Sequence, residues 1–114
     1  MFDVLSSPQF SVFLEELKLK SAQGDGASRQ LSKIVTKGIE KLKYDYRYGE
    51  HIRRERIPAE YFKNFGIENL WKLNLGSFWR MLYTIQGKES EVVSVILEVL
   101  DHKDYDRKFG YKTS

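Results

Sequence analysis

The chain has 114 residues, which is enough for one hydrophobic core, and we expect a single domain spanning residues 1–114. Hydrophobic residues make up 41% of the sequence and the net charge is +3, which argues against disorder, and no run approaches the length of a transmembrane helix. The absence of cysteine excludes disulfides, and with only two histidines we expect no bound metal or cofactor. The N-terminal residues lack the pattern of a secretory signal, so we expect a cytoplasmic protein with no membrane partner.

The first third of the chain predicts a short strand followed by two helices. Residues 2–5 alternate like an edge strand, and Ser7 and Pro8 then form a helix start, with Ser7 as the N-cap. After the glycines of "QGDGAS", apolar residues from Leu31 to Leu42 recur at helical spacing on one face. This pattern predicts a helical hairpin with one shared buried side.

The middle of the chain, "YDYRYGEHIRRERIPAEYFKNFG", is the least regular part. Its alternating tyrosines are able to stack on bases, although tyrosines in such a pattern more often lie over the edge of a core. The run "RRER" at 53–56 has the charge to contact phosphates, but such a run is more often a solvated face. Residues 58–66 predict a short helix opened by proline and closed by Gly66.

After residue 69 the hydrophobic period changes from 3.6 to 2. Segments 70–75, 78–85 and 92–100 predict three strands, with turns at 76–77 and 87–90 and a helix after residue 101. The predicted fold is α+β, with the N-terminal helical hairpin packed on one face of a small antiparallel sheet. Residues 69–88 contain no acidic side chain, which either favours an anion as ligand or is only a strand pair that happens to lack acids.

The alternation fixes which strand residues share a face. Trp71, Leu73 and Leu75 must face the helices together with Trp79, Met81 and Tyr83, which requires a three-residue loop that places Leu75 opposite Trp79. A two-residue turn would send Lys72 and Arg80 to opposite faces and bury one of them at a cost of several kcal/mol. We therefore expect Lys72, Asn74 and Arg80 to lie together on the exposed face.

The third strand extends this face if its uniformly apolar residues, Val93, Val95, Leu97 and Val99, face the helices. Glu98 and His102 then join the exposed face, with Glu98 opposite Arg80 and Tyr105 just beyond the strand. Two structural explanations remain open: Arg80 and Glu98 would form an ordinary cross-strand ion pair worth less than about 1 kcal/mol, or His102 would cap the following helix.

The segments "LWKLNLGSFWRMLYTI" and "VVSVILEVLDHKDYDRKFGY" resemble the C-terminal half of RelE/ParE-superfamily toxins. The histidine-then-tyrosine ending is most similar to mRNA interferases of the HigB and YoeB kind. The resemblance covers residues 69–111, and the order of elements before them agrees in pattern. It implies a RelE-like fold with the order β-α-α-β-β-β and a C-terminal helix.

The resemblance also implies a toxin of a type II toxin–antitoxin system, an endoribonuclease that cleaves mRNA on the ribosome without a metal. The 2′-hydroxyl of the RNA attacks the adjacent phosphate, which requires a base, a cation and an acid. The implied catalytic residues are Arg80, His102, Tyr105 and Glu98, where Glu98 is either a general base or only the partner of Arg80. The implied RNA-binding residues are Lys72, Asn74, Lys103 and Arg107.

The resemblance further implies that a cognate antitoxin and mRNA on the ribosome are the partners. Two other functions remain open on the same fold. One is a ParE-like toxin that inhibits DNA gyrase without catalysis, and the other is an inactive module that binds RNA or protein.

Overall fold

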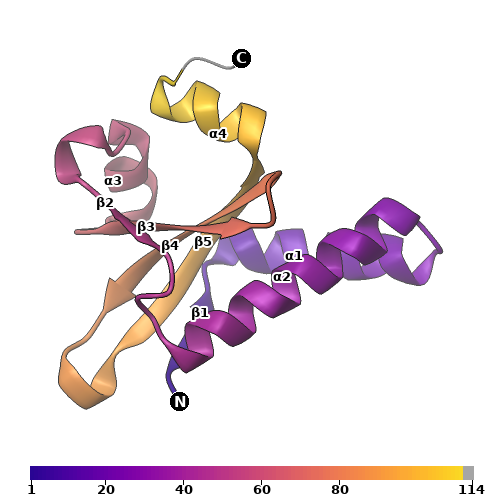
Figure 1. The fold of residues 1–114 in the computed structure, drawn as a ribbon, viewed down its shortest axis with the longest axis horizontal. Coiled ribbons are helices and arrows are strands. Elements are labelled where there is room, and N and C mark those ends of the chain that lie inside the picture. The colour runs from indigo at the N-terminus through magenta and orange to yellow at the C-terminus, as the bar shows by residue number, and fades with distance from the viewer. Residues whose placement is uncertain (112–114) are drawn as a thin grey trace.

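The computed structural model describes residues 1–111, apart from the side chain of Ser90, as four α-helices and one five-stranded sheet (Figure 1). The strands are β1 (Asp3–Ser6), β2 (Glu50–Ile52), β3 (Leu70–Leu75), β4 (Trp79–Gln86) and β5 (Val93–Asp101). The helices are α1 (Pro8–Ala22), α2 (Gly26–Tyr44), α3 (Ala59–Phe65) and α4 (His102–Phe109), with short 3₁₀ turns η1 (Arg54–Arg56) and η2 (Glu89–Glu91). The predicted α+β class and helical hairpin are confirmed, while β2 was not predicted. No helix in this part of the chain has both the length and the apolar character needed to cross a bilayer.

The sheet has the strand order β1-β5-β4-β3-β2. β1 runs parallel to β5 and every other neighbouring pair is antiparallel, so the sheet is mixed and the prediction of a wholly antiparallel sheet is wrong at this edge. Two hydrogen bonds from Ser7 hold the end of β1 beside β5 in the parallel orientation. Its N–H donates to the carbonyl of Ile96 at 2.9 Å and its hydroxyl donates to the carbonyl of Leu97 at 3.0 Å, so the chain enters α1 alongside β5.

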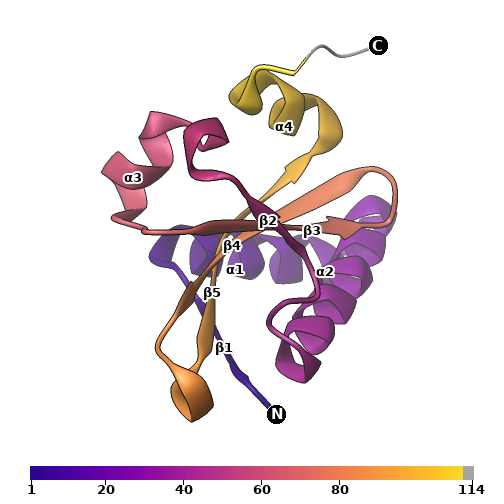
Figure 2. The same ribbon diagram turned by 60° about the vertical axis from the view of Figure 1, so that its left-hand side comes forward.

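The α1–α2 hairpin covers one face of the sheet (Figure 2). Ser7 caps α1 as predicted, because its side chain accepts a hydrogen bond from the N–H of Phe10 at 3.1 Å. Asp25 caps α2 by accepting from the N–H of Ser28. The buried core on this face contains Phe10, Leu17, Leu31, Val35, Leu42, Leu73, Leu75, Met81, Tyr83, Ile96 and Val99.

The loop between β3 and β4 has three residues, as the face assignment required. Leu75 pairs with Trp79 and Asn74 pairs with Arg80, while Gly76 takes a left-handed conformation with φ of +65°. Lys72 and Arg80 therefore lie on the same face of the sheet. The desolvation cost of burying either cation was enough to predict the loop length.

The register of β5 differs from the prediction. Placing Arg80 opposite Glu98 would pair Gln86 with Val92, but Gln86 pairs with Val93, so the two strands start one residue out of the predicted register. An irregularity between Leu82 and Tyr83 then leaves Leu97 as an extra residue on β5, which is a β-bulge.

This bulge changes which β5 side chains face the hairpin. Ile96 lies in the core beneath α1 and α2, whereas Val95 and Leu97 pack on the opposite face, so the predicted faces of Val95 and Leu97 are wrong. Val99 faces the hairpin as predicted, because the extra residue restores the alternation beyond Leu97. Arg80 consequently pairs with Leu100, and the prediction that it faces Glu98 is wrong.

The second face of the sheet is covered by α3 and α4, which the sequence-based prediction left exposed. Its apolar strand residues, Leu70, Leu82 and Leu97, are 0–2% exposed. They form a second buried core that also contains Ile52, Ile57, Ile67, Tyr61 and Tyr105. Lys72 and Arg80 thus lie on a face that is partly core and partly open.

Three buried tyrosines predict that the protein loses stability in alkali. Burial raises the pKa of Tyr83 and of Tyr105 to about 12, and burial together with the hydrogen bond to Glu98 raises the pKa of Tyr61 further. A raised folded-state pKa means that the unfolded chain ionises first, so this stabilisation is complete below pH 10 and is lost as the pH rises towards and beyond 12.

We therefore expect the free energy of unfolding, measured by urea denaturation, to fall above pH 10 by about 1.4 kcal/mol per pH unit for each tyrosine. Absorbance of tyrosinate, followed in the same samples, should rise first as exposed tyrosines such as Tyr44 ionise, and then in a second step as the protein unfolds. Unchanged stability up to pH 11 would contradict the burial of these hydroxyls.

Candidate functional site

The structure brings Lys72, Arg80 and Tyr105 together on the second face of the sheet. Lys72 and Arg80 come from adjacent strands β3 and β4, and α4 places Tyr105 above them. The Lys72 Nζ lies 5.2 Å from the centroid of the Tyr105 ring, within the range of a cation–π contact. These three residues were assigned to one site from the sequence, and they are neighbours in the fold.

Tyr105 is 4% exposed, and its hydroxyl makes no hydrogen bond to the described part of the chain. Burial is the main cause that raises its pKa to about 12, followed by the neighbouring Tyr111, while the positive charge of Arg80 acts in the opposite direction. The hydroxyl therefore keeps its proton at physiological pH. It is available as a hydrogen-bond donor to a ligand.

Arg80 lies at the base of the β3–β4 loop and does not form an ion pair among the described residues. Its Nη1 donates to the carbonyl oxygens of Trp79 at 3.0 Å and Ser77 at 3.3 Å. Asn74 is exposed opposite it. Because only weak backbone contacts hold the guanidinium, most of its donors remain available for an anion.

A cleft of about 240 Å³ opens beside Lys72 and Tyr105. One wall comes from β2 and the turn that follows it, and carries Glu50, His51, Arg53 and Arg56. The other wall carries Tyr105 and Tyr111 from the C-terminal segment. Three cations and one carboxylate line it, and that carboxylate, Glu50, lies 3.7 Å from the Lys72 Nζ.

The wall formed by β2 was missed in the sequence analysis. β2 has only three residues, which is too short for alternation to be recognised, and the "RRER" run read as an ordinary charged surface. The composition of residues 51–56 could have indicated this wall, because the segment contains three arginines and one histidine but only one glutamate. A site with this charge balance attracts anions.

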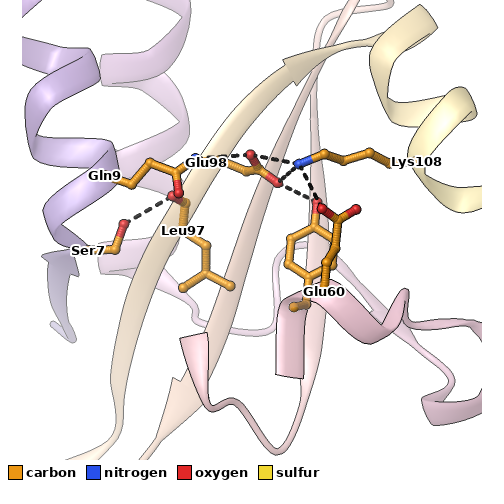
Figure 3. A network of polar contacts seen from close by, with 7 residues as sticks. Ser7, Gln9, Glu60, Leu97, Glu98 and Lys108 are labelled. Carbon is orange, nitrogen blue, oxygen red and sulfur yellow. Dashed lines mark hydrogen bonds and ion pairs between the residues drawn. The ribbon is translucent and has the colours of Figure 1, made fainter. Parts of the chain in front are cut away.

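Glu98 does not line this cleft, contrary to the prediction that it shares the site with Arg80. It lies instead in a network of polar contacts with Gln9 and Lys108 (Figure 3). It is 7% exposed and forms a charged network under α3 and α4. Its Oε2 accepts a hydrogen bond from the Tyr61 hydroxyl at 2.5 Å and lies 2.9 Å from the Lys108 Nζ, and its Oε1 accepts from the Gln9 amide at 3.3 Å. These partners occupy both carboxylate oxygens of Glu98 and tie the residue to α1, α3 and α4.

His102 also does not line the cleft. It is the first residue of α4, and Asp101 is the N-cap, because the Asp101 side chain accepts from the N–H of Asp104. The His102 N–H donates to the carbonyl of Phe78 at 2.7 Å, and the two rings meet edge to face with centroids 4.7 Å apart. The suggestion that His102 caps the helix is therefore wrong. Its Nδ1 is buried without a hydrogen-bond partner among the described residues.

The remaining predicted RNA-binding residues, Lys103 and Arg107, are exposed on α4. Arg107 forms an ion pair with Asp104 at 2.8 Å, and neither residue lines the cleft. Within the described residues, no group of three or more His, Asp or Glu side chains is placed to hold a metal ion.

Comparison with protein-family models, curated proteins and solved structures gave no match for this chain.

Proposed function

We propose that this protein is an RNA-cleaving toxin of the RelE type, which cuts mRNA on the ribosome. The single observation that carries the proposal is the convergence of Lys72, Arg80 and Tyr105 from three separate elements beside a cationic cleft. The order of helices and strands is compatible with such a fold.

The proposed reaction is a transesterification, in which one P–O bond forms and another breaks. The 2′-hydroxyl oxygen of the RNA bonds to phosphorus while the bond to the 5′-oxygen of the next nucleotide breaks, leaving a 2′,3′-cyclic phosphate and a 5′-hydroxyl. Arg80 and Lys72 stabilise the extra negative charge on the phosphate oxygens, and the protonated hydroxyl of Tyr105 donates a hydrogen bond to the same group.

The proton of the 2′-hydroxyl must be taken up and a proton delivered to the leaving oxygen. Histidine is the side chain type suited to both transfers near neutral pH. Of the two histidines, His51 lines the cleft, and in our proposal it takes up the proton of the 2′-hydroxyl in place of His102, while water delivers a proton to the leaving oxygen. Glu98 takes no part in proton transfer, because its oxygens are occupied by Lys108, Tyr61 and Gln9.

A cognate antitoxin would hold this activity off by covering the cleft. Because the cleft is lined by three cations and one carboxylate, an acidic antitoxin segment would match it in charge. Binding there would exclude RNA by occupying the same cations.

The second candidate is a binding module of the same fold that lacks catalysis. The observation in its favour is that neither Glu98 nor His102 lines the cleft. The two candidates differ in whether the purified protein cuts mRNA in a reconstituted translation reaction, with the new ends identified as a 2′,3′-cyclic phosphate and a 5′-hydroxyl. RNA binding without any cutting would favour the module.

Tyr105→Phe tests the role of the hydroxyl. We expect cleavage to fall about tenfold, because the change removes one hydrogen bond to a charged phosphate and leaves the buried ring in place. Tyr44→Phe, at a tyrosine that is 80% exposed, is the matched control and should cleave at the wild-type rate. Equal rates for the wild type and Tyr105→Phe would reduce Tyr105 to a packing residue.

A further inference from the structure

The η1 turn and the residue before it carry three arginines that differ in their contacts. Arg54 anchors the turn to the rest of the fold: its Nη1 donates to the carbonyl of Glu68 at 3.1 Å and its guanidinium lies 4.8 Å from the centroid of the Phe62 ring. Arg53 and Arg56 instead line the cleft. One arginine thus fixes the turn and the other two present their charges to the cleft.

The guanidinium of Arg56 contacts an aromatic ring but no anionic group in the described part of the chain. Its guanidinium lies 5.2 Å from the centroid of the Tyr111 ring, which positions it. Within residues 1–111 it has no carboxylate at ion-pair distance, and its side chain makes no hydrogen bond. A guanidinium supported on an aromatic ring keeps its N–H donors free for the two oxygens of a phosphate.

Arg53 adds a second charge on the same wall. Its only ion pair in the described part of the chain is with Glu55 at 3.2 Å, and both side chains are largely exposed, so the pair is weak and easily exchanged for a phosphate. The flanking Ile52 and Ile57 are 8% and 7% exposed, which holds the segment between them against the second core. The two cations are therefore presented from an anchored segment.

The size and lining of the cleft indicate what it binds. Its volume of about 240 Å³ is below the roughly 300–1,000 Å³ of sites that enclose a whole drug-sized ligand, so it suits one segment of a polymer. Cations that follow a backbone and aromatic rings that accept unstacked bases are the features of single-stranded nucleic acid sites. Tyr105 is too buried to stack on a base, so the rings available to a base are those of His51 and Tyr111. An acidic peptide would match the charge of the cleft but would not stack on these rings.

We propose that Arg53 and Arg56 bind the backbone of single-stranded RNA at phosphates next to the one that is cleaved. The strand then runs from Arg80 at the β3–β4 loop, past Lys72, to the η1 turn. This inference rests on the proposed function, because it names the path of the same substrate across the cleft.

Binding of an uncleavable strand tests this path separately from catalysis. The probe is a fluorescein-labelled single-stranded RNA with 2′-O-methyl groups, which lacks the attacking hydroxyl, and the readout is fluorescence anisotropy over a series of salt concentrations. We expect Arg56→Gln to raise the Kd about tenfold, the usual effect of removing a hydrogen bond to a charged group. The slope of log K against log salt should shrink by about 0.7 for each phosphate that the protein no longer neutralises, and the Arg53→Gln/Arg56→Gln double variant should bind more weakly than either single variant.

Lys37→Gln is the matched control, since it removes the same charge from an exposed position on α2, away from the cleft. Binding by the double variant that equals binding by Lys37→Gln overturns the inference, as does tighter binding of poly-glutamate than of RNA by the wild type. If Arg80→Ala loses cleavage while the double variant binds normally, the proposed function stands and this inference fails. A wild-type protein that binds the strand through Arg56 but never cuts mRNA supports the inference and overturns the proposed catalysis.

Discussion

Replacing Arg80 with alanine should lower the rate of mRNA cleavage by about a hundredfold or more while the protein stays folded. The negative charge on the phosphate grows in the transition state, and removing one donor aimed at such charge typically costs about 3 kcal/mol of barrier. Within residues 1–111 the Arg80 side chain donates only to the carbonyl oxygens of Ser77 and Trp79, so its removal leaves no buried charge there unpaired. Single-turnover cleavage in a reconstituted translation reaction measures the effect.

Arg29→Ala is a suitable control, because its side chain also donates to a backbone carbonyl, that of Ser21, but lies on α2, which covers the opposite face of the sheet from Arg80. It should cleave at the wild-type rate. Arg80→Lys keeps the positive charge but loses the planar guanidinium that binds two phosphate oxygens at once. Its cleavage rate should therefore fall between those of the wild type and Arg80→Ala. Full activity of Arg80→Ala, with the fold verified by circular dichroism, would remove Arg80 from the reaction.

Replacing Glu98 with alanine should lower the free energy of unfolding by about 3 kcal/mol. Removing one partner of a buried ion pair leaves the other without compensation, and in this network the Tyr61 hydroxyl also loses its acceptor. Lys108 is 32% exposed and gains some hydration when its partner is removed, so we expect the lower end of the range for such changes. Glu98→Gln keeps the hydrogen bond from Tyr61 and should be less destabilised.

Glu60→Ala serves as the control for the network, because Glu60 lies 3.9 Å from the same Lys108 Nζ but is 45% exposed. Its replacement should change stability by less than about 1 kcal/mol. Urea denaturation measures all three variants. If Glu98→Ala kept wild-type stability and lost only cleavage, Glu98 would be a general base after all and its structural role would be wrong.

The parts of the fold that sequence reasoning predicted are those where a wrong choice would bury a charge. Lys72 and Arg80 alternate with large apolar residues, so only one register of β3 against β4 keeps both out of the hairpin core, and the three-residue loop follows from that. The same constraint placed Lys72 and Arg80 on one face, whereas Tyr105 was assigned to the site from its position just beyond the third strand and from the resemblance. Ser7 was predicted as a cap because serine followed by proline has few other roles at that spacing.

The faces of β5 could not be predicted in this way. Residues 92–97 read "VVSVIL", which is apolar on both faces of the strand. Because either face can be buried there, the alternation of apolar and polar residues does not exclude a one-residue shift in register or the bulge at Leu97. Leu82, which shares a face with Arg80, did indicate that the supposedly exposed face needs a cover. The error in the position of Glu98 follows from treating the face as open, since a carboxylate there meets Tyr61 and Lys108 before it meets solvent.

The parallel pairing of β1 with β5 determines when the protein completes its fold during synthesis. Ser7 and Leu97, which are joined by a hydrogen bond, lie 90 residues apart in the chain, so β1 has no strand partner until β5 has left the ribosome. The same holds for the cationic cleft, which needs β2 and β3 from the middle of the chain and Tyr105 from near its end. The surface that we propose cuts mRNA therefore exists only after α4 has emerged from the ribosome.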